Sequence, residues 1–195
     1  CDVFWPGRGV AVSGLWRTKQ LEYSWQRALM GRYEPFSVLT RDALGYACES
    51  LGLPLTDGQV RTLLDDYLNL APYDDVAPAL ETLRRRGFKM AILTNGSPDM
   101  IEPLVRNRGW EKIFEAVMSV DSLGCFKPSP PVYQLAVDRL GIASGAIGFI
   151  STNGWDAQGA KSFGFQAYWI NRTGAPVDRL GFPPDAILRT FGELL

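Results

Sequence analysis

Apolar residues recur at helical intervals throughout the first 72 residues of the chain. The first helix is indicated by a long amphipathic stretch (Val12, Leu15, Trp16, Tyr23 and Met30). A second helix is expected over residues 39–51, and a third after a capping box that runs from Thr56 to Gln59. Because no strand pattern interrupts these helices, we expect residues 1–72 to form a helical subdomain.

Short apolar strands alternate with amphipathic helices from residue 73 onward. The pattern predicts four strands, over residues 89–94, 116–120, 146–151 and 166–170. It predicts helices over residues 76–86, 98–108, 131–140 and 156–163, and a short last helix after a tail rich in Pro and Gly. Such alternation is typical of a parallel, doubly wound sheet with right-handed crossovers. The predicted fold class is therefore α/β, with a Rossmann-like parallel sheet core at residues 73–195.

Composition and charge narrow the range of functions. A net charge of −1 and a pI near 5.5 argue against a nucleic-acid partner or an anionic membrane surface. No apolar run approaches the ~18 residues that a membrane span needs. Three cysteines without paired spacing indicate a reducing, cytoplasmic compartment. The absence of histidine removes Ser-His-Asp and Cys-His catalysis, so acid–base chemistry must come from carboxylates, Lys, Tyr or activated water.

Polar residues follow three of the predicted strands, at the edge where a parallel doubly wound sheet places its ligand site. Thr94 and Asn95 offer a hydroxyl and backbone N–H groups near a helix start, which suits a carboxylate or a phosphate. Lys127 precedes a proline, so its backbone is extended and its ammonium could reach across the strand ends. Asp156 stands at a helix start, where a carboxylate is favoured. The same loop holds Ser151, Thr152 and Asn153. Each feature also has an ordinary explanation, as an N-cap turn, a surface lysine or a first-turn acid.

Together these clusters resemble the haloacid dehalogenase superfamily in order, spacing and strand context. In that superfamily one strand ends in Ser or Thr, a later loop supplies a Lys before Pro, and a last loop supplies an Asp. Four further stretches look like the type II, L-specific 2-haloacid dehalogenases, which need no cofactor: residues 6–9, 15–25, 30–33 and 169–174. The likeness covers nearly the whole chain and implies a Rossmann-like core with a helical cap.

The resemblance implies a role for residues in both halves of the chain. Arg17 would reach from the cap to the departing halide, and Thr94 with the backbone N–H groups near Asn95 would bind the substrate carboxylate. Lys127 would stabilise and orient the nucleophilic carboxylate, and Asp156 would position or activate the water that cleaves the ester intermediate. The polar surroundings would be completed by Tyr133, Ser151 and Asn153. The pocket for the alkyl group and halogen would be formed by Leu21, Phe36 and Trp155, although each of these could equally be a core residue.

Thr152 favours a dehalogenase over a phosphatase. Phosphatases of the superfamily hold Mg²⁺ with carboxylates, one of which stands at the position that Thr152 occupies here. Hard divalent cations prefer charged oxygen ligands, so we expect no metal and no other cofactor. The implied reaction is displacement of halide by an aspartate, followed by hydrolysis of the ester. It would convert the small-molecule substrate, an L-2-haloalkanoic acid, to a D-2-hydroxyalkanoic acid. Relatives are typically homodimers, so a homodimer is expected.

The nucleophilic aspartate is the part of the resemblance that these residues do not carry. The family places it near the N-terminus, in an Asp-x-Tyr-Gly-Thr run at the end of the first strand, and Asp2 is a poor match. We expect the given chain to start after that strand and, by itself, to be inactive and prone to aggregate. Two alternatives stay open: a Mg²⁺-dependent phosphatase of the same superfamily, and a non-catalytic remnant. A nucleotide-binding Rossmann module would need a Gly-rich first turn, which the chain does not show.

Overall fold

The computed structural model describes residues 1–195, which divide into two compact units. Unit 1 comprises residues 1–70, 94–110 and 119–126, and unit 2 comprises residues 71–93, 111–118 and 127–195. The first boundary lies close to the expected border after residue 72, and two later segments group with the N-terminal helices. The division into a functional cap at residues 1–72 and a core at residues 73–195 stays a prediction.

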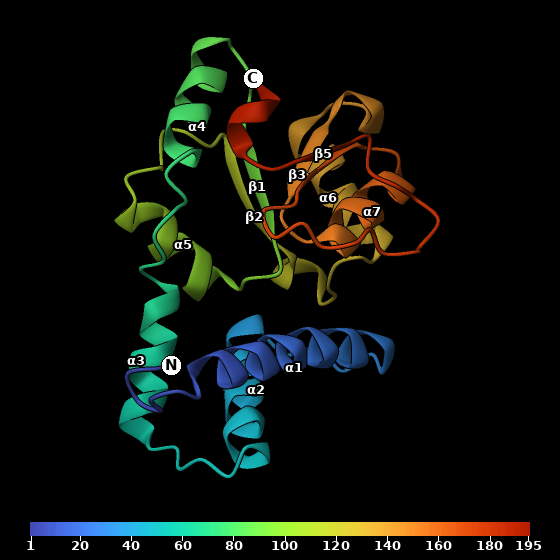
Figure 1. Cartoon of the computed structure of the whole chain (residues 1–195). Coiled ribbons are helices and arrows are strands. Elements are labelled where there is room, and N and C mark those ends of the chain that lie inside the picture. Colours follow the sequence, from blue (N-terminus) through green and yellow to red (C-terminus); the bar gives the residue numbers. More distant parts are fainter. The chain divides into compact units, whose positions relative to one another are not determined.

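Unit 1 is built mainly from helices (Figure 1). These are α1 (Gly9–Leu29), α2 (Phe36–Ser50), α3 (Asp57–Tyr67), α5 (Pro98–Asn107) and the short 3-10 helix η1 (Val120–Leu123). The expected capping box at the start of α3 is confirmed: the backbone N–H of Gln59 donates to Thr56 Oγ1 at 3.3 Å, and that of Thr56 donates to Gln59 Oε1 at 2.8 Å. The apolar stripes of α1 and α2 form the core of this unit, with Val12, Trp16, Ala43, Leu44 and Ala47 buried.

Unit 2 holds the strands and the helices that connect them (Figure 1). Its helices are α4 (Val76–Arg85), α6 (Pro130–Leu140) and α7 (Gly154–Phe163), with the 3-10 turns η2 (Ser144–Ala146) and η3 (Phe191–Leu194). Its strands are β1 (Ala91–Thr94), β2 (Ala116–Ser119), β3 (Gly148–Ser151), β4 (Gln166–Ile170) and β5 (Ala186–Leu188); the last residues of β1 and β2 belong to unit 1. β1 pairs with β2, and β4 lies between β3 and β5, parallel to both. The α/β class with parallel strands is confirmed, but the strands form two sheets.

Three of the four predicted strands are shorter than the sequence pattern predicts, whereas β4 has the predicted bounds. The N–H of Ile147 donates to the carbonyl of Ser144 at 3.0 Å and closes η2, so β3 begins at residue 148 rather than 146. Ser119 Oγ accepts the N–H of Asp121 at 3.2 Å and starts η1, so β2 ends at residue 119 rather than 120. β1 begins at residue 91 rather than 89. β5 was not predicted, since its three residues are too few to show an alternating pattern.

Aromatic rings dominate the core of unit 2. Tyr133 on α6 is fully buried. Its ring meets Phe149 and Phe165 edge-on at centroid distances of 5.8 and 5.9 Å, and Phe163 at 5.8 Å. Rings packed on several sides have little freedom to shift, so the position of the Tyr133 hydroxyl is set by the core.

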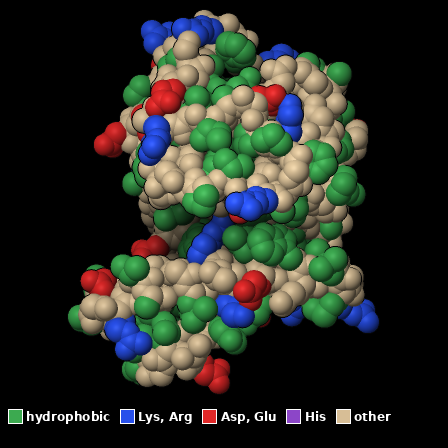
Figure 2. All heavy atoms as spheres, turned by 45° about the vertical axis from the view of Figure 1, so that its right-hand side comes forward, with side chains coloured by type: hydrophobic (Ala, Val, Ile, Leu, Met, Phe, Trp, Pro, Cys, Tyr) green, Lys and Arg blue, Asp and Glu red, His purple; other side chains and the backbone are tan.

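The surface carries charges of both signs. On the face shown in Figure 2, Lys and Arg side chains lie among Asp and Glu side chains and apolar ones. None of the helices combines the length and the apolar character that crossing a membrane requires. None of the three cysteines forms a disulfide bond.

Candidate active site

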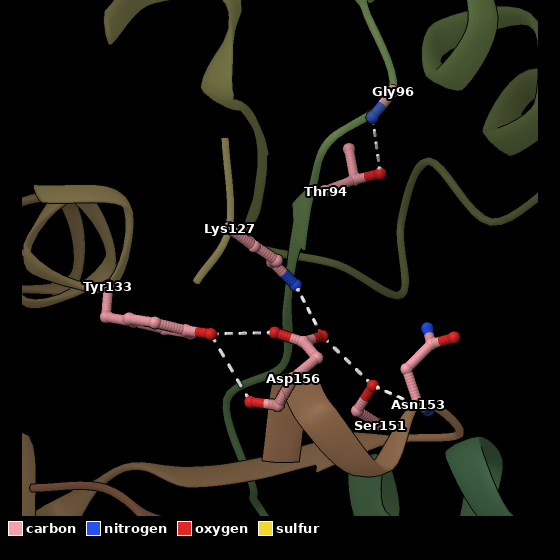
Figure 3. A network of polar contacts seen from close by, with 7 residues as sticks. All are labelled: Thr94, Gly96, Lys127, Tyr133, Ser151, Asn153 and Asp156. Atoms are coloured by element: carbon pink, nitrogen blue, oxygen red, sulfur yellow. Dashed lines mark hydrogen bonds and ion pairs between the residues drawn. The ribbon is translucent and has the colours of Figure 1, made fainter. Parts of the chain in front are cut away.

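The carboxylate of Asp156 is the centre of a buried polar cluster in unit 2 (Figure 3). Lys127 Nζ lies 3.0 Å from Asp156 Oδ2, and the Ser151 hydroxyl donates to the same oxygen at 3.0 Å. Tyr133 Oη donates to Asp156 Oδ1 at 2.9 Å and lies 3.3 Å from the backbone oxygen of Asp156. Ser151 Oγ in turn accepts the backbone N–H of Asn153 at 3.1 Å. Both carboxylate oxygens are therefore held by side chains from different elements.

Local sequence explains how these side chains converge. β3 ends at Ser151, and Asn153 is the N-cap residue of α7. Asp156 consequently falls in the first turn of α7, where the helix dipole favours a carboxylate. Lys127 precedes α6, whose first turn brings Tyr133 to the buried side of that helix.

Burial and charge act together in this cluster. The side chains of Lys127 and Asp156 are only 8% and 5% exposed. A buried ion pair is tolerated when further hydrogen bonds satisfy it, as Tyr133 and Ser151 do here. Lys127 Nζ also lies 4.7 Å from the ring centroid of Phe149. Burial, and then the charge of Asp156 and the hydrogen bond to it, raises the pKa of Tyr133 well above the usual range of tyrosine. Tyr133 is therefore a neutral hydrogen-bond donor at neutral pH.

A carboxylate fixed in this way can orient a water molecule and receive its proton, while Lys127 supplies a fixed positive charge. It is poorly suited to attack carbon itself, because three donors hold its two oxygens. No three or more His, Cys, Asp or Glu side chains are grouped so that they could hold a metal ion. The neighbours of Asp156 are hydrogen-bond donors rather than further carboxylates, which favours chemistry on an anionic organic substrate over Mg²⁺ binding.

Thr94 is the last residue of β1 and Asn95 follows it, and both belong to unit 1. Thr94 Oγ1 accepts the N–H of Gly96 at 3.0 Å, as Figure 3 shows, and Ser119 Oγ donates to the carbonyl of Gly96 at 2.7 Å. The N-cap residue of α5 is Ser97, so Thr94 is not itself the N-cap, although its hydroxyl takes part in the turn that leads into α5. The explanation of Lys127 as a surface lysine is wrong as well, because its side chain is buried.

The remaining predicted residues lie on helices. Arg17 is exposed on α1, and its Nη1 donates to Gln20 Oε1 at 2.6 Å. Leu21 is half-buried on α1, and Phe36 is buried at the start of α2. These three residues belong to unit 1, whereas Trp155 is half-buried on α7 in unit 2. The structure thus joins Lys127, Tyr133, Ser151, Asn153 and Asp156 in one network, and the roles of all the predicted site residues stay predictions.

Sequence reasoning missed three residues that support these side chains. Gln20 and Thr40 are fully buried and hydrogen-bonded between α1 and α2. Gly159 lies on α7 against Tyr133. A signal for Gln20 was present, because it continues the buried row of Val12 and Trp16 at intervals of four residues along α1.

Comparison with known proteins agrees with this geometry. Residues 5–164 match the family of haloacid dehalogenase-like hydrolases. The (S)-2-haloacid dehalogenase of Pseudomonas sp. (strain YL) is 49% identical over 185 residues, which cover 95% of this chain and 80% of that protein. The haloacetate dehalogenase H-2 of Moraxella sp. (strain B) is 46% identical, over 95% of this chain and 83% of that protein.

Solved structures give the same grouping. The L-2-haloacid dehalogenase of Xanthobacter autotrophicus with chloropropionic acid covalently bound has a TM-score of 0.89 and 38% identity, over 99% of this chain and 87% of that one. The L-2-haloacid dehalogenase RSc1362 has a TM-score of 0.97 and 40% identity, over the same shares of the two chains. The chain therefore belongs to the haloacid dehalogenase-like hydrolases and, within them, to the group of the L-2-haloacid dehalogenases.

Proposed function

We propose that this protein hydrolyses short L-2-haloalkanoic acids to D-2-hydroxyalkanoic acids and halide. An aspartate carboxylate forms a C–O bond to carbon 2 while the halide leaves with the electron pair of the C–X bond, which inverts that carbon. Water then attacks the aspartyl ester and loses a proton to a base, which releases the hydroxyacid and restores the carboxylate. The observation that carries the proposal is the buried carboxylate of Asp156, which Lys127, Tyr133 and Ser151 hold in a fixed orientation. Ester hydrolysis needs a fixed base of this kind.

The other residues contribute binding and charge. The hydroxyl of Thr94 and the backbone N–H groups near Asn95 bind the substrate carboxylate, and Arg17 stabilises the halide as it departs. Asn153 contributes to the polar surroundings of the ester. The alkyl group and halogen lie against Leu21, Phe36 and Trp155. The half-buried and buried positions of these apolar side chains support a pocket role, because an alkyl halide gains free energy from contact with apolar groups.

The nucleophile is supplied by an aspartate on a further strand. Asp156 does not fit that role, because donors hold both of its oxygens. Both sheets have edge strands with one hydrogen-bonded neighbour (β1, β2, β3 and β5), so each sheet offers edges to which another strand can pair. The measurement is the intact mass of the native protein together with its complete coding sequence. A native protein without an Asp-x-Tyr-Gly-Thr strand would contradict this assignment.

The reaction is tested with the native full-length protein and the two enantiomers of 2-chloropropionic acid. We expect chloride release from the L enantiomer only, with D-lactate as the product, and no change in rate on addition of EDTA. Release of phosphate from p-nitrophenyl phosphate that depends on Mg²⁺, without chloride release, would establish the phosphatase alternative instead.

Arg17→Ala tests the halide role separately. Turnover should fall sharply, whereas the unfolding midpoint in urea should fall only modestly, because Arg17 is exposed but the buried Gln20 Oε1 loses its donor. Arg41→Ala is the matched control, since Arg41 is an exposed arginine on the neighbouring helix α2, paired with Asp42. Equal turnover in the two variants would refute the role of Arg17.

We further propose that the protein is a homodimer and that it acts in the cytoplasm. Large apolar side chains are exposed on and next to α1 and α2, with Val10 and Leu29 each 89% exposed, Met30 64% and Tyr46 42%. A second copy that covered them would remove this apolar area from water. Three cysteines without a disulfide bond suit a reducing compartment. Light scattering over a range of concentrations measures the mass, and a monomer throughout would contradict the dimer.

A further inference from the structure

A chain of three hydrogen bonds runs through the contact between α1 and α2. Arg17 Nη1 donates to Gln20 Oε1 at 2.6 Å, Gln20 Nε2 donates to Thr40 Oγ1 at 2.7 Å, and Thr40 Oγ1 donates to the carbonyl of Phe36 at 2.7 Å. The indole N–H of Trp16 donates to the carbonyl of Thr40 at 2.7 Å. The chain thus connects Arg17 with the backbone of Phe36, two residues that the proposed function places beside the substrate.

The groups at the two ends of this series of hydrogen bonds determine which atom donates and which accepts in each bond. A guanidinium has donors only, so Gln20 must turn its carbonyl oxygen to Arg17 and its amide nitrogen to Thr40. The Thr40 hydroxyl accepts from that nitrogen and gives its own proton to Phe36, whose carbonyl can only accept. The orientation of the Gln20 amide is therefore determined from both sides, and with it the position of the oxygen that holds Arg17.

Packing alone does not explain why the two residues in the middle of this series of hydrogen bonds, Gln20 and Thr40, are polar. Gln20 and Thr40 are both 0% exposed. A buried amide and hydroxyl stabilise nothing relative to apolar groups of the same shape, and they cost free energy if any partner is lost. Apolar side chains fill the neighbouring positions of the same contact, such as Val12, Ala43 and Leu44. Polar side chains at these two positions therefore indicate that the group at the exposed end of the series, the guanidinium of Arg17, is held in a defined orientation.

We propose that Gln20 and Thr40 are positioning residues that hold the guanidinium of Arg17 in the orientation in which it stabilises the departing halide. This inference rests on the proposed function. The hydrogen bond to the anchored Gln20 restricts the rotamers of Arg17 before the substrate arrives, so less conformational entropy is lost when the halide is bound. Charge that develops on a leaving group is stabilised best by a donor that is already in place.

The test uses the native full-length protein with L-2-chloropropionate and L-2-bromopropionate. Thr40→Val keeps the size of the side chain but removes its acceptor and its proton, so the Gln20 amide loses its hydrogen bond to Thr40 and keeps only the one with Tyr67. We expect kcat/KM for the chloro substrate to fall on the order of 10- to 100-fold, the range expected when a catalytic group is misplaced by about 1 Å. The fall should be smaller for the bromo substrate, because bromide leaves more readily and needs less stabilisation. The chloro-to-bromo ratio of kcat/KM therefore decreases.

Two further variants and one control define the result. Gln20→Met removes the contact to Arg17 while Thr40 keeps its bond to Phe36, and it should lower the same ratio. Thr40→Ser restores the hydroxyl and should restore the ratio. The control is Thr62→Val on α3, where the hydroxyl bonds the carbonyl four residues earlier at 3.0 Å, as in Thr40, but Thr62 is exposed. It should leave the ratio unchanged.

The Arg17→Ala background separates a positioning role from a structural one. If Thr40 acts through Arg17, then Thr40→Val has no further effect on the ratio in that background. Equal losses for both halides in Thr40→Val, accompanied by a lower unfolding midpoint, would overturn the inference and leave only a structural tether. If Arg17→Ala changes the ratio but Thr40→Val and Gln20→Met do not, the inference fails while the proposed function stands. If the parent protein releases neither halide, the proposed function itself fails.

Discussion

Gly159 lies on α7 one turn after Asp156, and the absence of a side chain there leaves the space that Tyr133 fills. A Cβ at this position would lie 2.5 Å from Tyr133 Oη and 2.6 Å from the Cβ of Pro128. Both distances are far shorter than a van der Waals contact between such atoms. Gly159→Ala must therefore displace either the Tyr133 hydroxyl, which donates to Asp156, or the proline that follows Lys127.

The cost follows from how tightly these neighbours are held. Tyr133 is fully buried among Phe149, Phe163 and Phe165, so its ring cannot swing away without disturbing the core. Forcing an extra methyl into a packed core costs about 1–3 kcal/mol. Loss of the hydrogen bond to the charged Asp156 adds about 1.5–3 kcal/mol. Alanine inside a helix returns about 1 kcal/mol relative to glycine. We expect a net loss of about 1.5–5 kcal/mol in the free energy of unfolding.

The assay compares urea unfolding midpoints and turnover in Gly159→Ala and Gly14→Ala. Gly14 also lies inside a helix, α1, but a Cβ there would meet no atom within 4 Å. Gly14→Ala should therefore raise the free energy of unfolding by about 0.5–1 kcal/mol and leave turnover unchanged. Gly159→Ala should lower both the midpoint and the turnover.

A second variant identifies the clash as the cause. Tyr133→Phe removes the hydroxyl oxygen that the new methyl would strike, although the contact with Pro128 remains. The stability lost through Gly159→Ala should therefore be smaller in the Tyr133→Phe background than in the parent. If Gly159→Ala is as stable and as active as Gly14→Ala, the reasoning from close packing is refuted.

Two more predictions concern ion pairs. Lys127→Met leaves the carboxylate of Asp156 buried without its cation, so it should cost about 3–5 kcal/mol in urea unfolding. Lys161→Met breaks an ion pair that is about one-third exposed and should cost no more than about 1 kcal/mol; equal losses in the two variants would contradict the burial argument. Hydrogen bonds from Arg172 hold the pKa of Asp75 below its usual value, so its contribution to stability is present above the unfolded pKa and is lost as the pH falls through the lower folded pKa. Asp75→Asn should therefore lower the urea midpoint at neutral pH, by a difference that shrinks below about pH 4; a difference that does not depend on pH would refute the linkage.

The helices and the polar strand ends could be predicted from the sequence because both depend on local patterns. The capping box from Thr56 to Gln59 needs only four neighbouring residues, and it forms as expected. Asp156 was identified by its place after an apolar strand and at a helix start, which is also local information. The rule that ligand groups gather at the carboxyl ends of parallel strands was enough to select Lys127 and Asp156. It does not by itself explain their contact, because the strands that precede them, β2 and β3, belong to different sheets.

Long-range contacts explain what the sequence pattern could not predict. β5 pairs over only three residues, and its approach to β4 depends on Asp185, whose carboxylate accepts the backbone N–H of Ala167 at 2.8 Å. A side chain that extends a strand ladder in this way leaves no periodic signal. Residues 94–110 and 119–126 group with the N-terminal helices through contacts such as the hydrogen bond from Tyr33 Oη to Asp121 at 2.7 Å, which joins positions distant in the sequence.

Polar residues within an apolar stripe carry a signal of a different kind. The row Val12, Trp16, Gln20 and Ser24 along α1 is buried over its whole length. The apolar pattern alone would end this stripe at Trp16, since Gln and Ser are usually exposed. Burial of a polar side chain is stable only where each of its donors and acceptors has a partner, so such a residue constrains its surroundings more strongly than an apolar one. Gln20 is hydrogen-bonded to Arg17 on one side and to Thr40 on the other. The buried polar residue of this stripe is therefore connected to Arg17, a residue of the proposed site.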